Sequence, residues 1–189
     1  FFPQDFTNWK NYSINFITYA PCGSVYVYDT TSVDRIFNSQ LSYRKAAYVL
    51  HMLRWILGDN LFFDGTRQYY ENYKFNYAKT ENFKNVMEQV ADTSLTEFFN
   101  DWIYGEGYPI YTFYVNEIDN NSFSITVHQE ASCIASNFFE MPLPFLLSYN
   151  STNDTTIILN NNSQDQEFII NLPMPDNITF DPLKWILTA

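Results

Sequence analysis

The stretch that decides the fold is Ser42-Tyr43-Arg44-Lys45-Ala46-Ala47-Tyr48-Val49-Leu50-His51-Met52-Leu53-Arg54. Apolar side chains recur in it at spacings of three and four, which predicts one buried stripe of an amphipathic helix. The stripe consists of Tyr43, Ala46, Ala47, Leu50, Leu53 and Leu57. Gly58 should break this helix, and Asp59 is placed to cap the next one. The periodicity by itself indicates a core helix and no chemistry.

Further helices are predicted on both sides of this stretch. They run from Asp5 to Tyr19, from about Asn60 to Tyr77, and from Thr80 onward. A short helix is opened by Ser94-Leu95-Thr96-Glu97, a capping box in which the hydroxyl and the carboxylate each satisfy a free backbone amide. Amphipathic helices this closely spaced, with short links, predict a compact helical array.

The character of the chain changes after Gly107-Tyr108-Pro109. Short runs rich in β-branched and aromatic residues, separated by turn clusters, replace the helical period. They cover residues 110–115, 123–127, 142–149, 155–159, 168–172 and 178–180. Short strands at this spacing predict an antiparallel β-sandwich. The expected fold class is therefore α+β, with a helical part over residues 1–107 and a β-sandwich domain over residues 108–189.

Length and charge exclude several classes of protein. The chain has 189 residues, a net charge of −11 and a pI near 4.4, which argues against nucleic acid and anionic membranes as partners. No apolar run approaches the roughly 20 residues that a membrane span requires. The chain begins at Phe1 without an initiator Met, so we expect it to be an excised segment of a longer protein.

Two cysteines and several glycosylation sequons bear on the compartment. Cys22 and Cys133 could form a disulfide in an oxidising compartment, but their distance in the sequence leaves the pairing open. Sequons occur at Asn11, Asn120, Asn150, Asn153, Asn161 and Asn177. A chain this rich in Asn contains sequons by chance, and they mean glycans only in a eukaryotic secretory protein.

The residues offer no complete catalytic centre of a familiar kind. A zinc peptidase site needs three protein ligands and a general base, most often from His-Glu-x-x-His and a distal Glu. The chain has only His51 and His128, which are not at helical spacing, so no catalytic metal site is expected here. A site built from both histidines and both cysteines would lack paired ligand spacing. Nucleophile-elbow and phosphate-binding motifs are also absent from the sequence.

Several motifs nevertheless resemble one known family. Tyr43-Arg44-Lys45-Ala46, Val49-Leu50-His51-Met52-Leu53-Arg54 and Leu57-Gly58-Asp59 look like the segment of aminopeptidase N family zinc metallopeptidases, of the gluzincin type, that lies downstream of their zinc ligands. The resemblance continues through Leu95-Thr96-Glu97-Phe98-Phe99-x-x-Trp102 and Gly107-Tyr108-Pro109 to Phe139-Glu140-Met141-Pro142-Leu143. It covers about Ser24 to Trp185 and departs at Ala46, where the family more often has Gly.

The resemblance implies a fold and a role for one residue. The helical part would be the end of a thermolysin-like catalytic domain, followed by the family's β-sandwich. Tyr43 would be the catalytic residue of this segment, because the family's tyrosine at this place hydrogen-bonds the developing oxyanion of a peptide substrate. A phenol suits that role, since it donates a hydrogen bond without carrying charge at neutral pH.

The resemblance also implies what this segment lacks. The family's zinc helix and its Gly-x-Met-x-Asn motif would precede Phe1, so zinc is expected in the full-length enzyme and none in this fragment, which should be inactive alone. Helices deprived of their packing partner should expose an apolar face and self-associate. We expect the enzyme to be secreted, periplasmic or at the cell surface. The alternatives are a stand-alone interaction or glycan-binding module and a catalytically dead scaffold.

Overall fold

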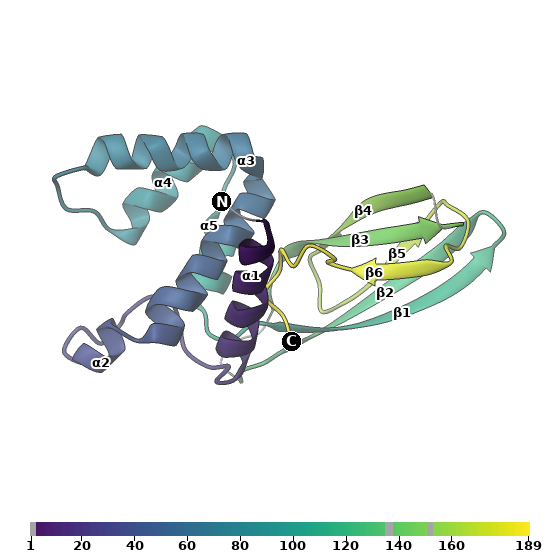
Figure 1. The fold of residues 1–189 in the computed structure, drawn as a ribbon, viewed down its shortest axis with the longest axis horizontal. Helices are drawn as coiled ribbons and strands as arrows, with labels where there is room; N and C mark the ends of the chain where they lie inside the picture. Colours follow the sequence, from purple (N-terminus) through teal and green to yellow (C-terminus); the bar gives the residue numbers. More distant parts are fainter. Residues whose placement is uncertain (1–2, 135–137, 151–152) are drawn as a thin grey trace.

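The computed structural model describes residues 3–134, 138–150 and 153–189, and it has helices in its first half and strands in its second (Figure 1). The helical part contains α1 (Pro3–Thr18), α2 (Val33–Ile36), the π-helix η1 (Ser39–Lys45), α3 (Ala46–Tyr73), α4 (Thr80–Ala91), α5 (Thr96–Phe99) and the π-helix η2 (Asn100–Tyr104). The fold is α+β, as the sequence predicts.

Helix α3 changes direction at Gly58, as predicted. Gly58 has φ +74° and ψ +164°, a conformation in which an L side chain is strained, so glycine is the residue that fits there. Asp59 lies just beyond the kink and forms a bidentate ion pair with Arg54, at 2.7 and 2.8 Å. The kink therefore lets one long helix lie along both α1 and α4.

The capping box predicted before α5 is only half present: Ser94 accepts from an amide, but the Glu97 carboxylate does not. Ser94 Oγ accepts a hydrogen bond from Thr96 N at 3.3 Å, but the helix begins only at Thr96. The free amide of Leu95 donates to Glu88 Oε1 of α4 at 2.7 Å. Glu88, and not Glu97, is thus the carboxylate that accepts from a free amide before α5.

The second half folds into two three-stranded antiparallel sheets. One has the order β1-β2-β5, with β1 (Pro109–Asp119), β2 (Ser122–Ala131) and β5 (Asp165–Ile170); the other has the order β4-β3-β6, with β3 (Met141–Tyr149), β4 (Asn153–Asn161) and β6 (Asn177–Phe180). The sheets pack through aromatic rings: Phe113 of β1 lies 5.0 Å from Phe145 and 4.7 Å from Phe180, between ring centroids. All six predicted strands are present.

A disulfide and the segment that follows β6 both join the two halves. Cys22, after α1, forms a disulfide with Cys133, after β2, with their Cα atoms 5.4 Å apart. After β6, the chain returns to α3, where the Lys184 carbonyl accepts from Tyr48 Oη at 2.8 Å. Asp181 fixes this return by accepting from the amides of Trp185 and Ile186, at 2.8 and 2.7 Å.

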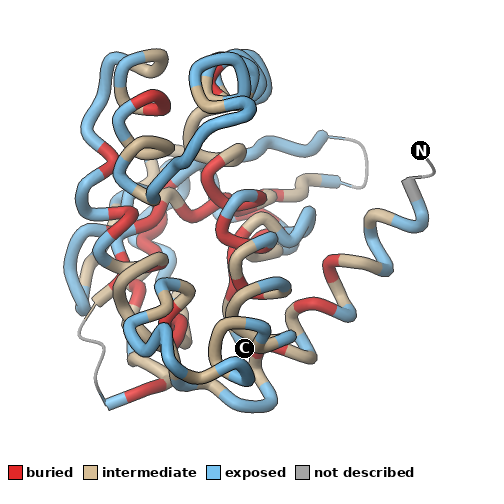
Figure 2. Tube along the Cα trace, turned by 90° about the vertical axis from the view of Figure 1, so that its left-hand side faces the viewer, coloured by how far each residue is buried: buried red, intermediate tan, exposed pale blue. Residues whose placement is uncertain are grey.

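Buried residues lie on α3 and α5 and along β2 and β3, and Figure 2 shows them gathered in the interior, whereas α1 lies at the side with its N-terminal end exposed. The helices end at Tyr104 and the first strand begins at Pro109. The division into domains at residues 107 and 108 stays a prediction. None of the described helices is both long enough and apolar enough to cross a membrane.

Candidate functional site

Tyr43 lies on a π-helical turn immediately before α3. Asn38 caps this turn, because its Oδ1 accepts from the amides of Gln40 and Leu41, at 3.1 and 2.8 Å. π-helical turns are uncommon and occur frequently at functional sites. The Tyr43 side chain is 56% exposed, and its hydroxyl has no hydrogen-bond partner among the described residues. Tyr43 therefore presents a free phenol to the surface.

The turn that carries Tyr43 is held by hydrogen bonds to the end of α1 and to the loop that follows it. Gln40 Nε2 donates to the Ile17 carbonyl at 2.8 Å, and Lys45 Nζ donates to the Gly23 carbonyl at 2.9 Å. Lys45 is only 1% exposed, and this burial lowers its pKa to about 8, although nearby Glu106 acts in the opposite direction. Residues on both sides of Tyr43 thus fix η1 to the loop that also carries the disulfide.

The predicted buried stripe of the Tyr43 helix is wrong. Of its six residues only Leu53 is buried, while Tyr43, Ala47 and Leu50 are exposed. The buried stripe is instead the adjacent one, which consists of Lys45, Tyr48, Val49, Met52 and Leu53. Both stripes satisfy the helical spacing, and contacts with α1 and the C-terminal segment select the second.

The Tyr43 helix carries two apolar faces. A helix that is apolar on more than one side is usually buried on more than one side. In this chain the face with Tyr43 and Leu50 has no cover from the described residues, since these side chains are 56% and 41% exposed. This uncovered face, formed by Tyr43, Ala47 and Leu50, is called the Tyr43 face below.

An open groove of about 390 Å³ lies beside the π-helical turn. Its lining residues are Tyr12, Asn15, Phe16, Tyr19 and Gln40. Arg44, the neighbour of Tyr43, places its guanidinium 4.6 Å from the Tyr12 ring centre and 4.5 Å from that of Phe16. Sequence reasoning did not identify this groove, because only the fold brings α1 against η1.

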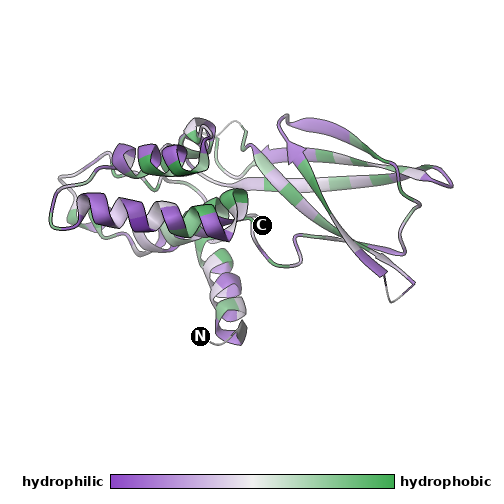
Figure 3. Ribbon diagram, turned by 90° about the horizontal axis from the view of Figure 1, so that it is seen from above, coloured by the Kyte–Doolittle hydropathy of each residue, from purple (hydrophilic) through white to green (hydrophobic). Residues whose placement is uncertain are grey.

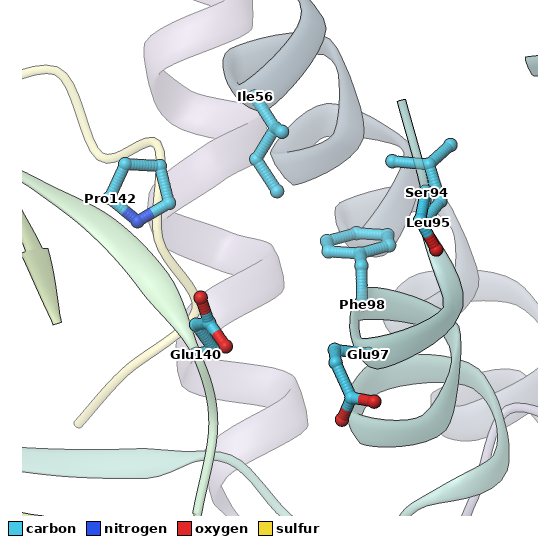
Figure 4. A pocket seen from close by; sticks show the side chains of 7 residues that line it. All are labelled: Ile56, Ser94, Leu95, Glu97, Phe98, Glu140 and Pro142. Atoms are coloured by element: carbon cyan, nitrogen blue, oxygen red, sulfur yellow. The ribbon is translucent and has the colours of Figure 1, made fainter. Parts of the chain in front are cut away.

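A second pocket, of about 240 Å³, lies at the junction of the helices and the sandwich. Its lining includes the acids Glu97 and Glu140 and the apolar side chains of Phe98 and Ile56 (Figure 4). Asp101 Oδ2 accepts from Glu140 N at 3.2 Å, and burial raises the Asp101 pKa to about 6. The pocket shares no lining residue with the groove beside Tyr43.

The two histidines lie in different parts of the fold. His51 stacks on Trp185, with ring centroids 4.5 Å apart, and its Nε2 lies 3.1 Å from the Lys184 carbonyl. His128 on β2 contacts Asp165, with 2.6 Å between Nδ1 and Oδ1. Each histidine therefore has a different set of partners in a different half of the molecule.

The residues present do not fit a zinc centre. Among the described residues, the one group of three close metal-ligating side chains is Cys22, Glu106 and Cys133, and its two sulfurs are bonded to each other. A thiolate is the form of cysteine that binds zinc. Cys22 and Cys133 therefore form the disulfide that the sequence leaves open. In this oxidised form neither cysteine can bind a metal as a thiolate.

Comparisons with known proteins relate the helical part of the chain to one peptidase family. Residues 11–102 match the family model described as the peptidase family M1 domain. Aminopeptidase N of Lactobacillus helveticus is 27% identical over 89 residues, which are 47% of this chain and 10% of that protein. Probable aminopeptidase 2 of Sulfurisphaera tokodaii is 33% identical over 84 residues, which are 44% of this chain and 11% of that protein.

A solved structure extends the likeness of fold to the second half. The crystal structure of Legionella pneumophila aminopeptidase A in complex with aspartic acid matches with a TM-score of 0.67 and 14% identity. The match covers 85% of this chain and 18% of that one. The chain spans only about a tenth of the length of the curated relatives.

Proposed function

Since residues 11–102 carry part of a peptidase family M1 domain, we propose that the chain is the C-terminal part of a zinc-dependent aminopeptidase. The whole enzyme would hydrolyse the peptide bond at the N-terminus of a peptide. Zinc and its ligands would come from residues outside these 189, because the residues present do not fit a zinc centre. By itself, the chain would be inactive. As in the sequence-based expectation, the enzyme would be secreted, periplasmic or at the cell surface.

The observation that carries this proposal is the free phenol of Tyr43 on an uncovered apolar face. The hydroxyls of Tyr48 and Tyr108 donate to the Lys184 and Thr18 carbonyls, whereas that of Tyr43, like that of exposed Tyr70, has no partner among the described residues. Tyr43 differs from Tyr70 in its place, because it lies on the uncovered apolar face before the Gly58 kink. The Tyr43 hydroxyl is left available to a substrate. As the peptide carbonyl becomes tetrahedral, its oxygen gains negative charge, and the phenol would donate a hydrogen bond that strengthens with that charge.

The position of Tyr43 is suited to such a donor. Hydrogen bonds of Asn38, Gln40 and Lys45 fix the π-helical turn, so the backbone that carries the Tyr43 side chain has a defined position. A donor that needs no reorganisation when charge develops is worth more than a mobile one. The Tyr43 face would be covered by another part of the longer enzyme, which would complete the active site and exclude water.

The proposal is tested with the longer protein that contains these residues. It should hydrolyse an aminoacyl p-nitroanilide with a free amine and should not hydrolyse the same substrate after N-acetylation. The isolated 189-residue chain should hydrolyse neither. Hydrolysis of the acetylated substrate would contradict the aminopeptidase assignment, and a longer protein inactive on both would favour the catalytically dead scaffold.

A further inference from the structure

We propose that Asn120, Asn153 and Asn177 are N-glycosylation sites when the chain passes through a eukaryotic secretory pathway. Each begins an Asn-x-Ser/Thr sequon, with Ser122, Thr155 and Thr179 at its third position. Asn-x-Ser/Thr is the acceptor motif for N-linked glycans and belongs on exposed surface. The inference goes beyond the proposed peptidase and does not depend on Tyr43.

The fold collects these three sequons at one end of the molecule. Asn120 lies in the turn between β1 and β2, while Asn153 begins β4 and Asn177 begins β6. Asn153 pairs with Tyr149, and Asn177 pairs with Ser148, so the two flank the end of β3. Figure 1 shows that β1 and β3 both end at the tip of the sandwich farthest from the helices. We call this the distal tip.

The surroundings of the three side chains can accept a glycan. All three asparagines are exposed. Figure 3 shows mostly hydrophilic residues where the strands end at the distal tip. Asn177 Nδ2 also donates to Thr179 Oγ1 at 3.1 Å, within its own sequon. A glycan at this end would point into solvent and away from the Tyr43 face.

A fourth sequon serves as an internal control. Asn161, at the helical end of β4, is 0% exposed. Its Nδ2 donates to the Ser163 carbonyl at 2.8 Å and to Gln166 Oε1 at 3.2 Å, and its Oδ1 accepts from Gln129 at 3.0 Å. Both amide hydrogens are in use, so the folded chain has no room for a glycan on this nitrogen.

The remaining two sequons are left out of the proposal. Asn11 lies within α1, and the Ser13 of its sequon is buried. The sequon of Asn150 includes Ser151 and Thr152, which lie outside the described residues. The disulfide between Cys22 and Cys133 is consistent with passage through a secretory compartment, because disulfides persist in oxidising environments such as the lumen of the endoplasmic reticulum.

The modification itself requires a lipid-linked oligosaccharide as donor. Nδ2 of each asparagine forms a bond to the anomeric carbon of a polyprenyl-pyrophosphate-linked sugar. The bond between that carbon and the phosphate oxygen breaks, and the lipid pyrophosphate leaves with the electron pair. The amide nitrogen loses one proton and keeps the other.

The test is secretion of the 189-residue chain from a eukaryotic cell line, followed by glycan release with peptide N-glycosidase in heavy-oxygen water. Released sites become labelled aspartates, which peptide mass spectrometry locates. We expect label at residues 120, 153 and 177 and none at 161 in protein whose cysteines are oxidised. Each of Asn120→Gln, Asn153→Gln and Asn177→Gln should remove one glycan from the intact mass.

The matched control is Ser163→Ala, which destroys the sequon of Asn161 without altering the Asn161 side chain. It should leave the number of glycans unchanged, and a loss of one glycan would contradict the burial argument. Secreted, oxidised chain that is unlabelled at all three proposed sites would overturn the proposal. Label at Asn161 in such protein would overturn it as well.

Discussion

His51 shows how burial changes the chemistry of one residue. Aromatic rings of Phe6, Trp9, Tyr48 and Trp185 surround it, with centroids 4.5 to 5.9 Å away. A carbonyl can only accept, so Nε2 carries hydrogen and donates to Lys184. Desolvation lowers the His51 pKa to about 4, and the charges of Lys10 and Arg54 act in the same direction. Neutral His51 therefore stabilises the junction between α3 and the C-terminal segment.

This pKa predicts a pH dependence of stability. In the unfolded chain His51 binds a proton near pH 6.5, and in the folded chain only near pH 4. Between these values the unfolded state binds more protons, so the contribution of His51 is fully present above pH 6.5 and is lost as pH falls to 4. The loss should be on the order of 2–3 kcal/mol.

The measurement compares urea unfolding of the wild type and His51→Phe across this pH range. The variant keeps a stacking ring, so its free energy of unfolding should fall less than that of the wild type on acidification. Half-buried Asp101 and buried Asp181, whose pKa values are raised, act in the opposite sense and are common to both proteins. His128 is half-exposed, and its hydrogen bond with Asp165 raises its pKa, so its contribution is already fully present below pH 6.5. His128→Phe should therefore keep the wild-type decline between pH 6.5 and 4. An equal decline in His51→Phe would contradict the account.

At the scale of the elements, helix α3 has more apolar surface than the described chain covers. Leu50 is 41% exposed although it lies one turn from buried Leu53. An isolated chain can hide such a surface by self-association. We expect the 189-residue chain to form dimers or larger species through the Tyr43 face.

Leu50→Glu tests this expectation. A charge on the Tyr43 face should shift the chain towards monomer in sedimentation velocity, with little change in melting temperature, because Leu50 is not part of the core. Tyr70→Glu is the matched control: Tyr70 is also exposed on α3, at 62%, but lies beyond the Gly58 kink. If the wild-type chain is monomeric at high concentration, the expectation that it self-associates through the Tyr43 face is wrong.

The elements also show what the sequence can predict. The six strands lie where alternation and turn clusters placed them, because a strand and its turns are encoded by neighbouring residues. Spacing alone predicts the wrong buried face for the Tyr43 helix, because residues 43–57 satisfy helical spacing on two faces. Only distant partners such as Lys184 choose between the two faces. The groove beside Tyr43 likewise depends on α1, which sequence spacing cannot place.

At the scale of the whole molecule, the disulfide joins the helical part to the sandwich across 111 residues of sequence. Closing a loop of that length restricts the unfolded chain and so raises the free energy of unfolding, typically by about 2–5 kcal/mol for a native disulfide. The pairing could not be predicted because the residues that bring both sulfurs together, such as Lys45 with Gly23, are set by the fold.

Cys22→Ser/Cys133→Ser should therefore lower the free energy of unfolding by about 2–5 kcal/mol. Reduction of the wild type should lower it by a similar amount, and the reductant should have no effect on the double variant. Equal stability of oxidised and reduced wild type would contradict this role. Urea unfolding followed by circular dichroism, with and without reductant, measures the free energy of unfolding of both forms of the wild type.

The central claim is that Tyr43 donates a hydrogen bond to the reacting oxygen in the longer enzyme. The most direct test is the kinetics of Tyr43→Phe in that protein on an aminoacyl substrate, with Tyr70→Phe as an exposed control on α3. The account predicts that kcat falls about 10²–10³-fold in Tyr43→Phe, while KM and the melting temperature change little. A kcat within a few-fold of both the wild type and Tyr70→Phe would contradict it.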